Sequence, residues 1–236
     1  MNKQNFIEEL LKLNIKISDI QLEKLEKYYE ILERENKLYN LTSITEKESV
    51  FLKHFYDSLT IVKIIDLNNE TLCDLGTGAG FPGMVLKIMF PNLKVTLIDA
   101  TLKKCNFLEK VIKELKLEKI NVINARVEEY AKIEREKYDI VTARAVAPLK
   151  HLLEYGVPLL KVNGTFVAMK GNINEELDNI DIYLDKLKIK QDKRIDFQLP
   201  IENSHRILIS FIKLEKTDTK YPRKYSEIKK KSRNFP

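Results

Sequence analysis

The chain has 236 residues, of which 44% are hydrophobic and 32% charged, and its formal net charge is +6. This length suits one medium-sized globular domain with an appendage. No apolar run reaches the roughly 18 residues that span a bilayer, and acidic residues near the N-terminus argue against a signal peptide. We therefore expect a cytoplasmic protein without a membrane partner.

Residues 1–69 are predicted to form a helical extension, because positions 1–66 contain neither glycine nor proline. Helices are expected over residues 4–13, from 18 to about 37, and from 45 to about 65. The second begins with a capping box from Ser18 to Gln21, and the third with one from Thr45 to Glu48. Residues near the helical period form the expected buried face of the second helix: Ile20, Leu22, Leu25, Tyr28 and Leu32.

From residue 70 onward, apolar segments alternate with helical ones, which predicts a parallel sheet with right-handed crossovers. Strands are expected at 71–74, 94–99, 120–124, 138–143 and 164–170. Helices are expected at 83–90, 102–117, 127–131, 149–160 and 174–187. Two further β-rich stretches, 189–198 and 206–214, are predicted to form an antiparallel pair at one edge. We therefore predict an α/β domain over residues 70–216, with a Rossmann-like, mostly parallel seven-stranded sheet.

The two cysteines carry no signal of a metal site or a disulfide. Cys73 falls in an apolar strand and Cys105 on an expected helix, without the spacing of metal ligands. We expect both to be reduced residues of the core, as in cytoplasmic proteins. No metal site is predicted.

The positive charge is concentrated at the C-terminus. Residues 217–236 hold seven Lys or Arg and two acidic residues, a net charge of +5, so the rest of the chain is nearly neutral at +1. We predict a flexible basic tail, whose interleaved Tyr221, Tyr225 and Phe235 suit a polyanionic partner. The alternative is a solvated terminus that only aids solubility.

Four of the seven glycines lie within eight residues, at positions 76, 78, 80 and 83. Glycine is needed where the backbone turns sharply or where a ligand approaches it closely. A strand, a glycine-rich turn and a helix in this order form the nucleotide-binding corner of a doubly wound sheet. We therefore expect Gly76 and Gly78 to border a nucleotide or nucleoside.

Polar residues at the carboxyl ends of the strands are candidate ligand contacts, because such sheets bind ligands there. Asp99 suits the two hydroxyls of a ribose, or else caps the following helix. Glu128 lies where an adenine edge would fall, or else is a first-turn helix acid. Arg144 is expected over the ligand, or else caps backbone carbonyls or pairs with Asp139.

A nicotinamide dinucleotide is one alternative for the ligand, because residues 78–83 match the spacing Gly-x-Gly-x-x-Gly. The register disagrees, since the third fingerprint position counted from Gly76 is Phe81. Pro82 also removes a backbone N–H where a diphosphate would bind. A nucleoside without phosphate fits better. We therefore prefer S-adenosyl-L-methionine, without excluding the dinucleotide.

The end of the fourth strand lacks residues that several methyl acceptors require. It has no Asn/Asp-Pro-Pro-aromatic clamp for an exocyclic amine and no cysteine for cytosine C5. Lys170 is a candidate base for a ribose hydroxyl, but no acid follows the strand to orient it. An acceptor with a free lone pair, such as guanine N7, needs no base, so its methylation depends on alignment and electrostatics.

Seven segments in chain order carry a family resemblance: LYNLTS at 38–43, HFYDS at 54–58, DLGTGAGFPG at 74–83, Asp99, ARVEE at 125–129, TARA at 142–145 and MKG at 169–171. Together they resemble the small-subunit ribosomal RNA methyltransferase G family, also called glucose-inhibited division protein B. The resemblance covers roughly residues 5–215. It implies a class I S-adenosyl-L-methionine-dependent methyltransferase that methylates guanine N7 in the 530 loop of 16S rRNA.

The same resemblance implies a set of site residues. The cofactor contacts of the family fall on Gly76, Phe81, Val127, Glu128 and Arg144, with Asp99 near the ribose, and Gly78 joins them from the glycine loop. No residue is required as an acid or base, and Arg144 is the candidate positioning residue. The expected partner of this monomer is 16S rRNA, the small ribosomal subunit or its precursor.

Two other functions stay open at this point. The chain could be a non-catalytic RNA-binding or ribosome-assembly factor that retains the cofactor fold, or a methyltransferase acting on a small molecule. His54 and Asp57, three residues apart on one helix face, either orient the loop at Tyr39 and Asn40 or contact RNA.

Overall fold

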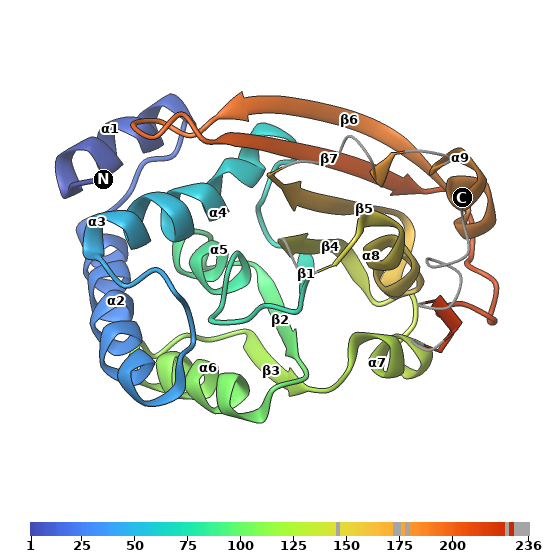
Figure 1. Cartoon of the computed structure of the whole chain (residues 1–236), viewed down its shortest axis with the longest axis horizontal. Coiled ribbons are helices and arrows are strands. Elements are labelled where there is room, and N and C mark those ends of the chain that lie inside the picture. The colour runs from blue at the N-terminus through green and yellow to red at the C-terminus, as the bar shows by residue number, and fades with distance from the viewer. Residues whose placement is uncertain (145–146, 172–175, 178–179, 225–226, 229–236) are drawn as a thin grey trace.

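A seven-stranded sheet forms the centre of the molecule (Figure 1), in the order β3-β2-β1-β4-β5-β7-β6. The computed structural model describes residues 1–144, 147–171, 176–177, 180–224 and 227–228. The strands are β1 (Thr71–Leu75), β2 (Lys94–Asp99), β3 (Ile120–Asn124), β4 (Tyr138–Arg144), β5 (Leu160–Lys170), β6 (Ile189–Gln198) and β7 (His205–Lys213). Strands β1 to β5 are parallel, whereas β7 is antiparallel to both β5 and β6. The predicted sheet is confirmed.

Helices cover both faces of the sheet and create two hydrophobic cores. One core includes α5 (Gly83–Met89) and α6 (Leu102–Glu114), and the other includes α7 (Val127–Ile133), α8 (Leu149–Gly156) and α9 (Ile180–Leu187). Successive strand residues face opposite sides, so Val167 of β5 enters the first core and Phe166 the second. None of the helices in the described residues has the length and apolarity that a membrane span needs.

The differences from the predicted boundaries are mostly small. The helix expected at 149–160 ends at Gly156 and continues as a 3-10 turn, η3 (Val157–Leu159), so β5 begins four residues earlier than predicted. Helix α9 begins at Ile180, and residues 174–175 and 178–179 of the predicted helix lie outside the described residues. Cys73 and Cys105 are free and buried, as predicted.

The helical extension begins with α1 (Lys3–Lys12) and α2 (Asp19–Tyr39), and the capping box of Ser18 and Gln21 is confirmed. The predicted buried face of α2 was wrong at Ile20, which is 67% exposed. At 100° per residue, Ile20 lies about 200° around the helix from Leu22. The stripe that packs on the protein is Leu22, Leu25, Tyr28, Ile31 and Leu32.

The third predicted helix is a continuous helical segment of changing pitch, α3 (Lys47–Val50), the π-helix η1 (Phe51–Tyr56), α4 (Asp57–Leu59) and the 3-10 turn η2 (Thr60–Lys63). The second predicted capping box was wrong. Glu46 is the N-cap, and its carboxylate accepts the backbone N–H groups of Glu48 and Ser49. A carboxylate therefore replaces the hydroxyl that Thr45 was expected to provide.

The extension packs directly on the glycine loop, residues 76–82. The Tyr28 hydroxyl of α2 donates to the Ala79 carbonyl, and the Tyr28 ring lies 5.7 Å from that of Phe81. Extension and sheet share one hydrophobic core, which also contains Phe55 and Leu108. The extension therefore forms one wall of whatever site the glycine loop creates.

The start of the basic tail is docked, which corrects the prediction that it is flexible. Arg223 pairs with Glu154 of α8 at 2.6 Å, and Glu154 is completely buried. Arg135 donates to the carbonyls of Thr217 and Tyr221 at 2.7 Å. Several residues on which the charge and aromatic predictions rested lie outside the described residues: Tyr225, Lys229, Lys230, Lys231, Arg233 and Phe235.

Candidate functional site

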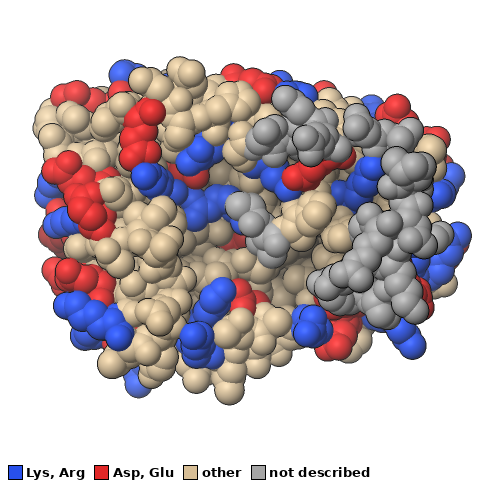
Figure 2. All heavy atoms as spheres, viewed as in Figure 1, with Lys and Arg blue, Asp and Glu red and all other residues tan. Residues whose placement is uncertain are grey.

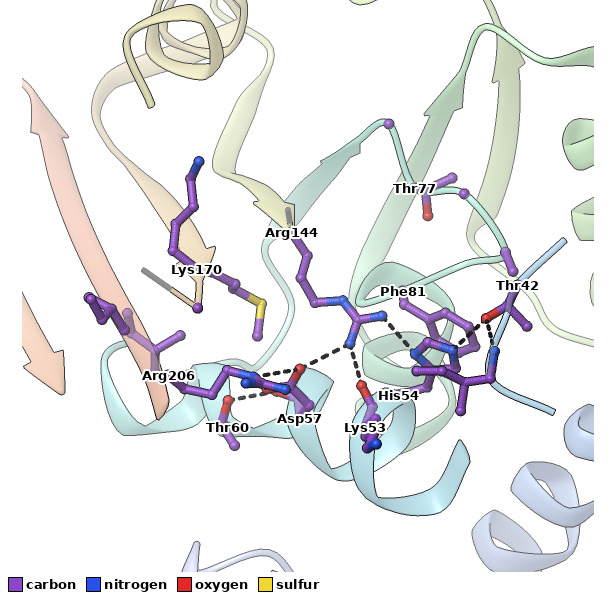
Figure 3. Close-up of a pocket in the computed structure, with 18 of the residues that line it drawn as sticks. Thr42, Lys53, His54, Asp57, Thr60, Thr77, Phe81, Arg144, Lys170 and Arg206 are labelled. Carbon is purple, nitrogen blue, oxygen red and sulfur yellow. Dashed lines mark hydrogen bonds and ion pairs between the residues drawn. The ribbon is translucent and has the colours of Figure 1, made fainter. Parts of the chain in front are cut away.

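A cavity of about 560 Å³ opens at the carboxyl ends of β1, β4 and β5 (Figure 3). The glycine loop contributes Gly76, Gly78 and Phe81 to its lining, and β4 contributes Arg144. Most of the remaining lining comes from the extension and from the β5 and β7 ends, with Lys104 of α6 and Phe197 of β6. The structure therefore brings four of the predicted site residues together around one cavity. Three of them belong to the glycine loop, and Arg144 belongs to β4.

The four clustered glycines divide into two pairs with different roles. Gly76 and Gly78 border the cavity with φ angles of 61° and 62°, and a Cβ atom at Gly78 would meet only the Gly76 carbonyl, 4.0 Å away. A Cβ at Gly83 would instead overlap Leu97 and Asp74, and one at Gly80 would overlap Tyr28. Gly76 and Gly78 therefore line the cavity, with open space at the Cβ position of Gly78, whereas Gly80 and Gly83 are needed for packing.

Asp74 ties the two ends of the glycine loop together. Its Oδ2 accepts from the Thr77 hydroxyl at 2.6 Å and from the Gly83 N–H at 2.8 Å. Its Oδ1 is buried and has no hydrogen-bond partner among the described residues. Burial raises the pKa of Asp74 to about 6. The hydrogen bonds that Asp74 accepts therefore fix the backbone conformation of the glycine loop.

Asp99 lies beside the glycine loop and outside the cavity lining. Its carboxylate accepts from the N–H of Gly78 at 3.0 Å and from that of Thr101 at 2.8 Å. The N-cap of α6 is Thr101, so the alternative role of Asp99 as that cap was wrong. Contact of Asp99 with a ribose stays a prediction.

Val127 and Glu128 form the first turn of α7 and are not part of the cavity lining. Glu128 is buried and lies 3.7 Å from the Arg126 guanidinium. The first-turn position agrees with the structural alternative considered for Glu128. Contact of either residue with a cofactor stays a prediction.

Arg144 points from the end of β4 toward the extension (Figure 3), and its ion pair differs from the one considered. Its NH1 group donates to Asp57 Oδ2 at 3.2 Å. Asp139 lies at the start of β4, where it accepts from Lys161 at 2.7 Å and from Thr71. Pairing of Arg144 with Asp139 was therefore wrong, because the two residues stand at opposite ends of one strand.

His54 lies between Arg144 and the glycine loop. Its Nδ1 accepts from the Arg144 guanidinium at 3.0 Å, and its ring stacks on Phe81 with centroids 4.2 Å apart. A guanidinium only donates, so Nδ1 carries no proton and Nε2–H donates to the Thr42 hydroxyl at 3.0 Å. Burial and the positive charge of Arg144 lower the pKa of His54 to about 3.

Arg206, Lys53 and Thr42 are among the cavity residues that were not predicted. Arg206 of β7 donates through Nε to both carboxylate oxygens of Asp57, at 3.1 and 3.2 Å. For Arg206, the only signal in the sequence was that arginine is rare in this chain. That rarity does not indicate where the residue lies in the fold. Their partners lie 12 to 149 residues away in sequence.

Lys170 is engaged in an ion pair. Its ammonium group donates to Glu176 at 2.8 Å and to the Ala147 carbonyl at 2.7 Å, and its side chain is 7% exposed. The cavity therefore offers its ligands hydrogen-bond donors and positive charge, and the Lys170 ammonium group is already engaged by Glu176 and the Ala147 carbonyl.

We expect His54 to make the folded state sensitive to acid. Its pKa is near 6.5 when unfolded and about 3 when folded, so its contribution to stability is present above pH 6.5 and is lost as the pH falls toward 3. Between pH 7 and 5 this loss is about 2 kcal/mol of unfolding free energy. Urea unfolding across this range should show a shallower loss for His54→Asn. Equal slopes would mean that folded His54 is protonated.

The family of this sequence is indicated by two comparisons. Residues 21–202 match the sequence model of the family described as rRNA small subunit methyltransferase G. A ribosomal RNA small subunit methyltransferase G from Lysinibacillus sphaericus is 46% identical over 228 residues, which cover 95% of this chain and 96% of that protein.

Two solved structures share the fold. A SAM-dependent methyltransferase from Aquifex aeolicus has a TM-score of 0.54 at 16% identity, covering 73% of this chain and 96% of that one. M. jannaschii TYW2 in complex with AdoMet has a TM-score of 0.55 at 16% identity, covering 74% of this chain and 79% of that one. At this identity, they establish the architecture alone.

Proposed function

The chain belongs to the rRNA small subunit methyltransferase G family, and from this premise we propose that it methylates N7 of a guanine in the 530 loop of 16S rRNA. It is an S-adenosyl-L-methionine-dependent methyltransferase of small-subunit rRNA. The observation that carries the N7 assignment is that titratable groups around the cavity are already engaged in ion pairs or hydrogen bonds with other residues. Lys170 is paired with Glu176, Asp57 with two arginines, and His54 accepts from Arg144.

Guanine N7 suits such a site because it carries a lone pair and no proton. When bound, S-adenosyl-L-methionine would supply the methyl group as a sulfonium, and the N7–carbon bond would form as the sulfur–carbon bond breaks, with the bonding electrons left on sulfur. No proton moves, and positive charge passes from sulfur to the base. The protein then contributes alignment, exclusion of water and electrostatics.

The residues present fit S-adenosyl-L-methionine. Gly76 and Gly78 line the cavity, and the open space at the Cβ position of Gly78 lets a ligand approach the loop closely. We assign donor contacts to these two residues and to Phe81, Asp99, Val127, Glu128 and Arg144. Arg144 carries a fork of N–H groups that suits a carboxylate.

The surface around the site suits RNA. Lys and Arg side chains lie above and below the recessed centre of the face in Figure 2. Lys53, Lys104 and Arg206 belong to the cavity lining, and Lys53 and Lys104 are the more exposed of the three. These cations would neutralise phosphates near the target nucleotide.

A methyl-transfer assay tests the function. Labelled S-adenosyl-L-methionine is supplied with unmodified 16S rRNA and with small subunits that lack the modification, and the methylated nucleotide is then mapped. Label at guanine N7 in the 530 loop supports the proposal. Label elsewhere in the rRNA would overturn the position, and RNA binding without label would favour the assembly factor. Label only in a low-molecular-weight acceptor would favour the small-molecule enzyme.

We further propose that the protein acts as a monomer in the cytoplasm. Light scattering during size exclusion, with and without rRNA, measures the number of copies. A stable dimer at assay concentration would contradict this.

Replacing Lys229, Lys230, Lys231 and Arg233 by glutamine is expected to weaken RNA binding. For every phosphate that the protein no longer neutralises, the slope of log affinity against log salt becomes shallower by about 0.7 to 0.9, so the slope should fall by up to about 3. Fluorescence anisotropy across a salt series measures it. The docked Arg223 stays intact in this variant, and an unchanged slope would favour the solubility role of the tail.

A further inference from the structure

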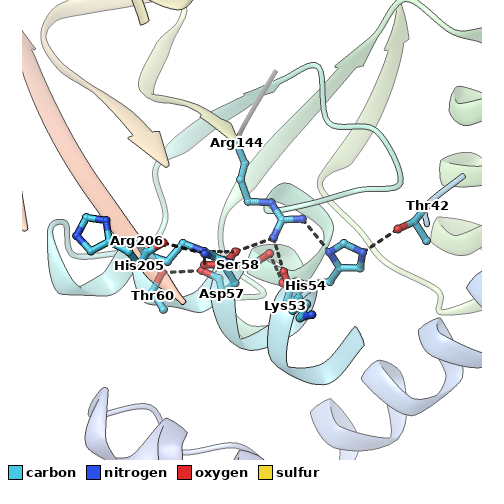
Figure 4. Close-up of polar contacts among 9 residues, drawn as sticks. All are labelled: Thr42, Lys53, His54, Asp57, Ser58, Thr60, Arg144, His205 and Arg206. Atoms are coloured by element: carbon cyan, nitrogen blue, oxygen red, sulfur yellow. Dashed lines mark hydrogen bonds and ion pairs between the residues drawn. The ribbon is translucent and has the colours of Figure 1, made fainter. Parts of the chain in front are cut away.

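The Arg144 guanidinium is held by hydrogen bonds to one short segment of the helical extension (Figure 4). Its NH1 group donates to the Lys53 carbonyl at 2.9 Å and to Asp57 Oδ2 at 3.2 Å, and its NH2 group donates to His54 Nδ1 at 3.0 Å. All three acceptors lie within one helical turn. The residue at the end of β4 is therefore fixed by a segment that precedes the sheet in sequence.

The helical geometry of that segment explains how three acceptors converge. Lys53 and His54 lie in the π-helix η1, and Asp57 follows it directly at the start of α4. Residues four apart in a helix share a face, which places Asp57 beside Lys53. Single π-helical turns occur often at functional sites. The turn presents a carbonyl, a ring nitrogen and a carboxylate to the same guanidinium.

His54 links Arg144 to the glycine loop. Its ring lies flat against Phe81, with 14° between the planes, and the Arg144 guanidinium lies 5.3 Å from the centre of the same Phe81 ring. Its Nε2 is held by Thr42 from the loop after α2. A rotation of the His54 ring would therefore move both the arginine and the wall of the glycine loop.

Asp57 links Arg144 to the antiparallel edge of the sheet. Its side chain is 7% exposed, and its carboxylate lies between the guanidinium groups of Arg144 and Arg206. Without this negative charge the two arginines, whose side chains are 14% and 23% exposed, would face each other with no carboxylate between them, which is costly for charges largely shielded from water. Asp57 therefore fixes the distance and angle between them.

We propose that His54 and Asp57 are positioning residues for methyl transfer, acting through Arg144. They hold its guanidinium so that the N–H groups not used by the extension face the carboxylate of the methyl donor. This rests on the proposed function. The positioning role of His54 and Asp57 makes the helical extension part of the reaction centre. Within the described residues, three of the five N–H groups of Arg144 have partners in the extension.

A double-mutant cycle tests the inference, with donor affinity measured by calorimetry and kcat and KM by methyl transfer. His54→Phe keeps a ring against Phe81 and removes the acceptor, whereas His54→Asn restores an acceptor near the Nδ1 position. We expect His54→Phe to weaken donor binding at least tenfold and His54→Asn to recover most of it. In an Arg144→Ala background, His54→Phe should have no further effect.

Three controls keep the outcome decisive. Asp57→Asn supplies a second variant in the same cycle, and melting temperatures show whether each variant is folded. His205→Phe makes the same exchange at a histidine that is 51% exposed and outside the cavity lining, so donor affinity should not change. Effects of His54→Phe and Arg144→Ala that add fully would overturn the inference. Donor binding without rRNA methylation would instead count against the proposed function alone.

Discussion

Valine in place of Gly78 is expected to abolish binding of S-adenosyl-L-methionine while the chain stays folded. Gly78 borders the cavity and has free space at its Cβ position, so the added side chain would fill the volume next to the glycine loop. Its φ of 62° adds about 1–2 kcal/mol of strain for a residue with a Cβ atom. The affinity should fall at least a hundredfold, with a drop of only a few degrees in melting temperature.

Calorimetric titration of the donor and a thermal scan measure both effects. Gly78→Ala is the matched control, because it introduces the same backbone strain with a smaller side chain and should lose less affinity. Unaltered affinity in the valine variant would show that this part of the loop does not contact the donor. A collapse in melting temperature would show that the position is needed for packing.

Valine in place of Gly83 is expected to have the opposite profile, with loss of the fold as its first effect. A Cβ atom there would overlap Leu97 of β2 and the Asp74 carboxylate, both of which are buried. Overpacking a filled core costs about 3 kcal/mol. Displacement of Asp74 would also disturb the hydrogen bonds that hold the glycine loop.

For a domain of this size, that cost lowers the melting temperature by about 10 °C. Chemical unfolding measures the free energy directly. The two valine variants therefore separate a binding role from a packing role within one glycine cluster. A Gly83→Val protein of normal stability would show that α5 moves away from β2 without penalty.

Local patterns in the sequence were enough for most of the architecture. The alternation of strands and helices, the antiparallel edge and the first capping box depend on neighbouring residues, and each was predicted correctly. The second capping box failed for a local reason as well. Glu46 competes with Thr45 for the same backbone N–H groups, and the carboxylate accepts two of them.

Only part of the site was predicted. Features that depend on neighbouring residues could be predicted, whereas contacts between residues far apart in the sequence could not. The glycine loop and Arg144 could be placed at strand ends because parallel strands align those ends. The packing roles of Gly80 and Gly83 could not be predicted, since they depend on Tyr28 and Leu97, which lie against these two glycines only in the folded chain.

By itself, the sequence determined the α/β fold, the glycine loop and the methyltransferase family of this protein. The tertiary structure alone decided what surrounds Arg144. The contacts of Arg144 with His54 span 90 residues, and those of Asp57 with Arg206 span 149. Such pairs form where packing of the extension on the sheet brings their charges together, and no spacing within the chain records that packing.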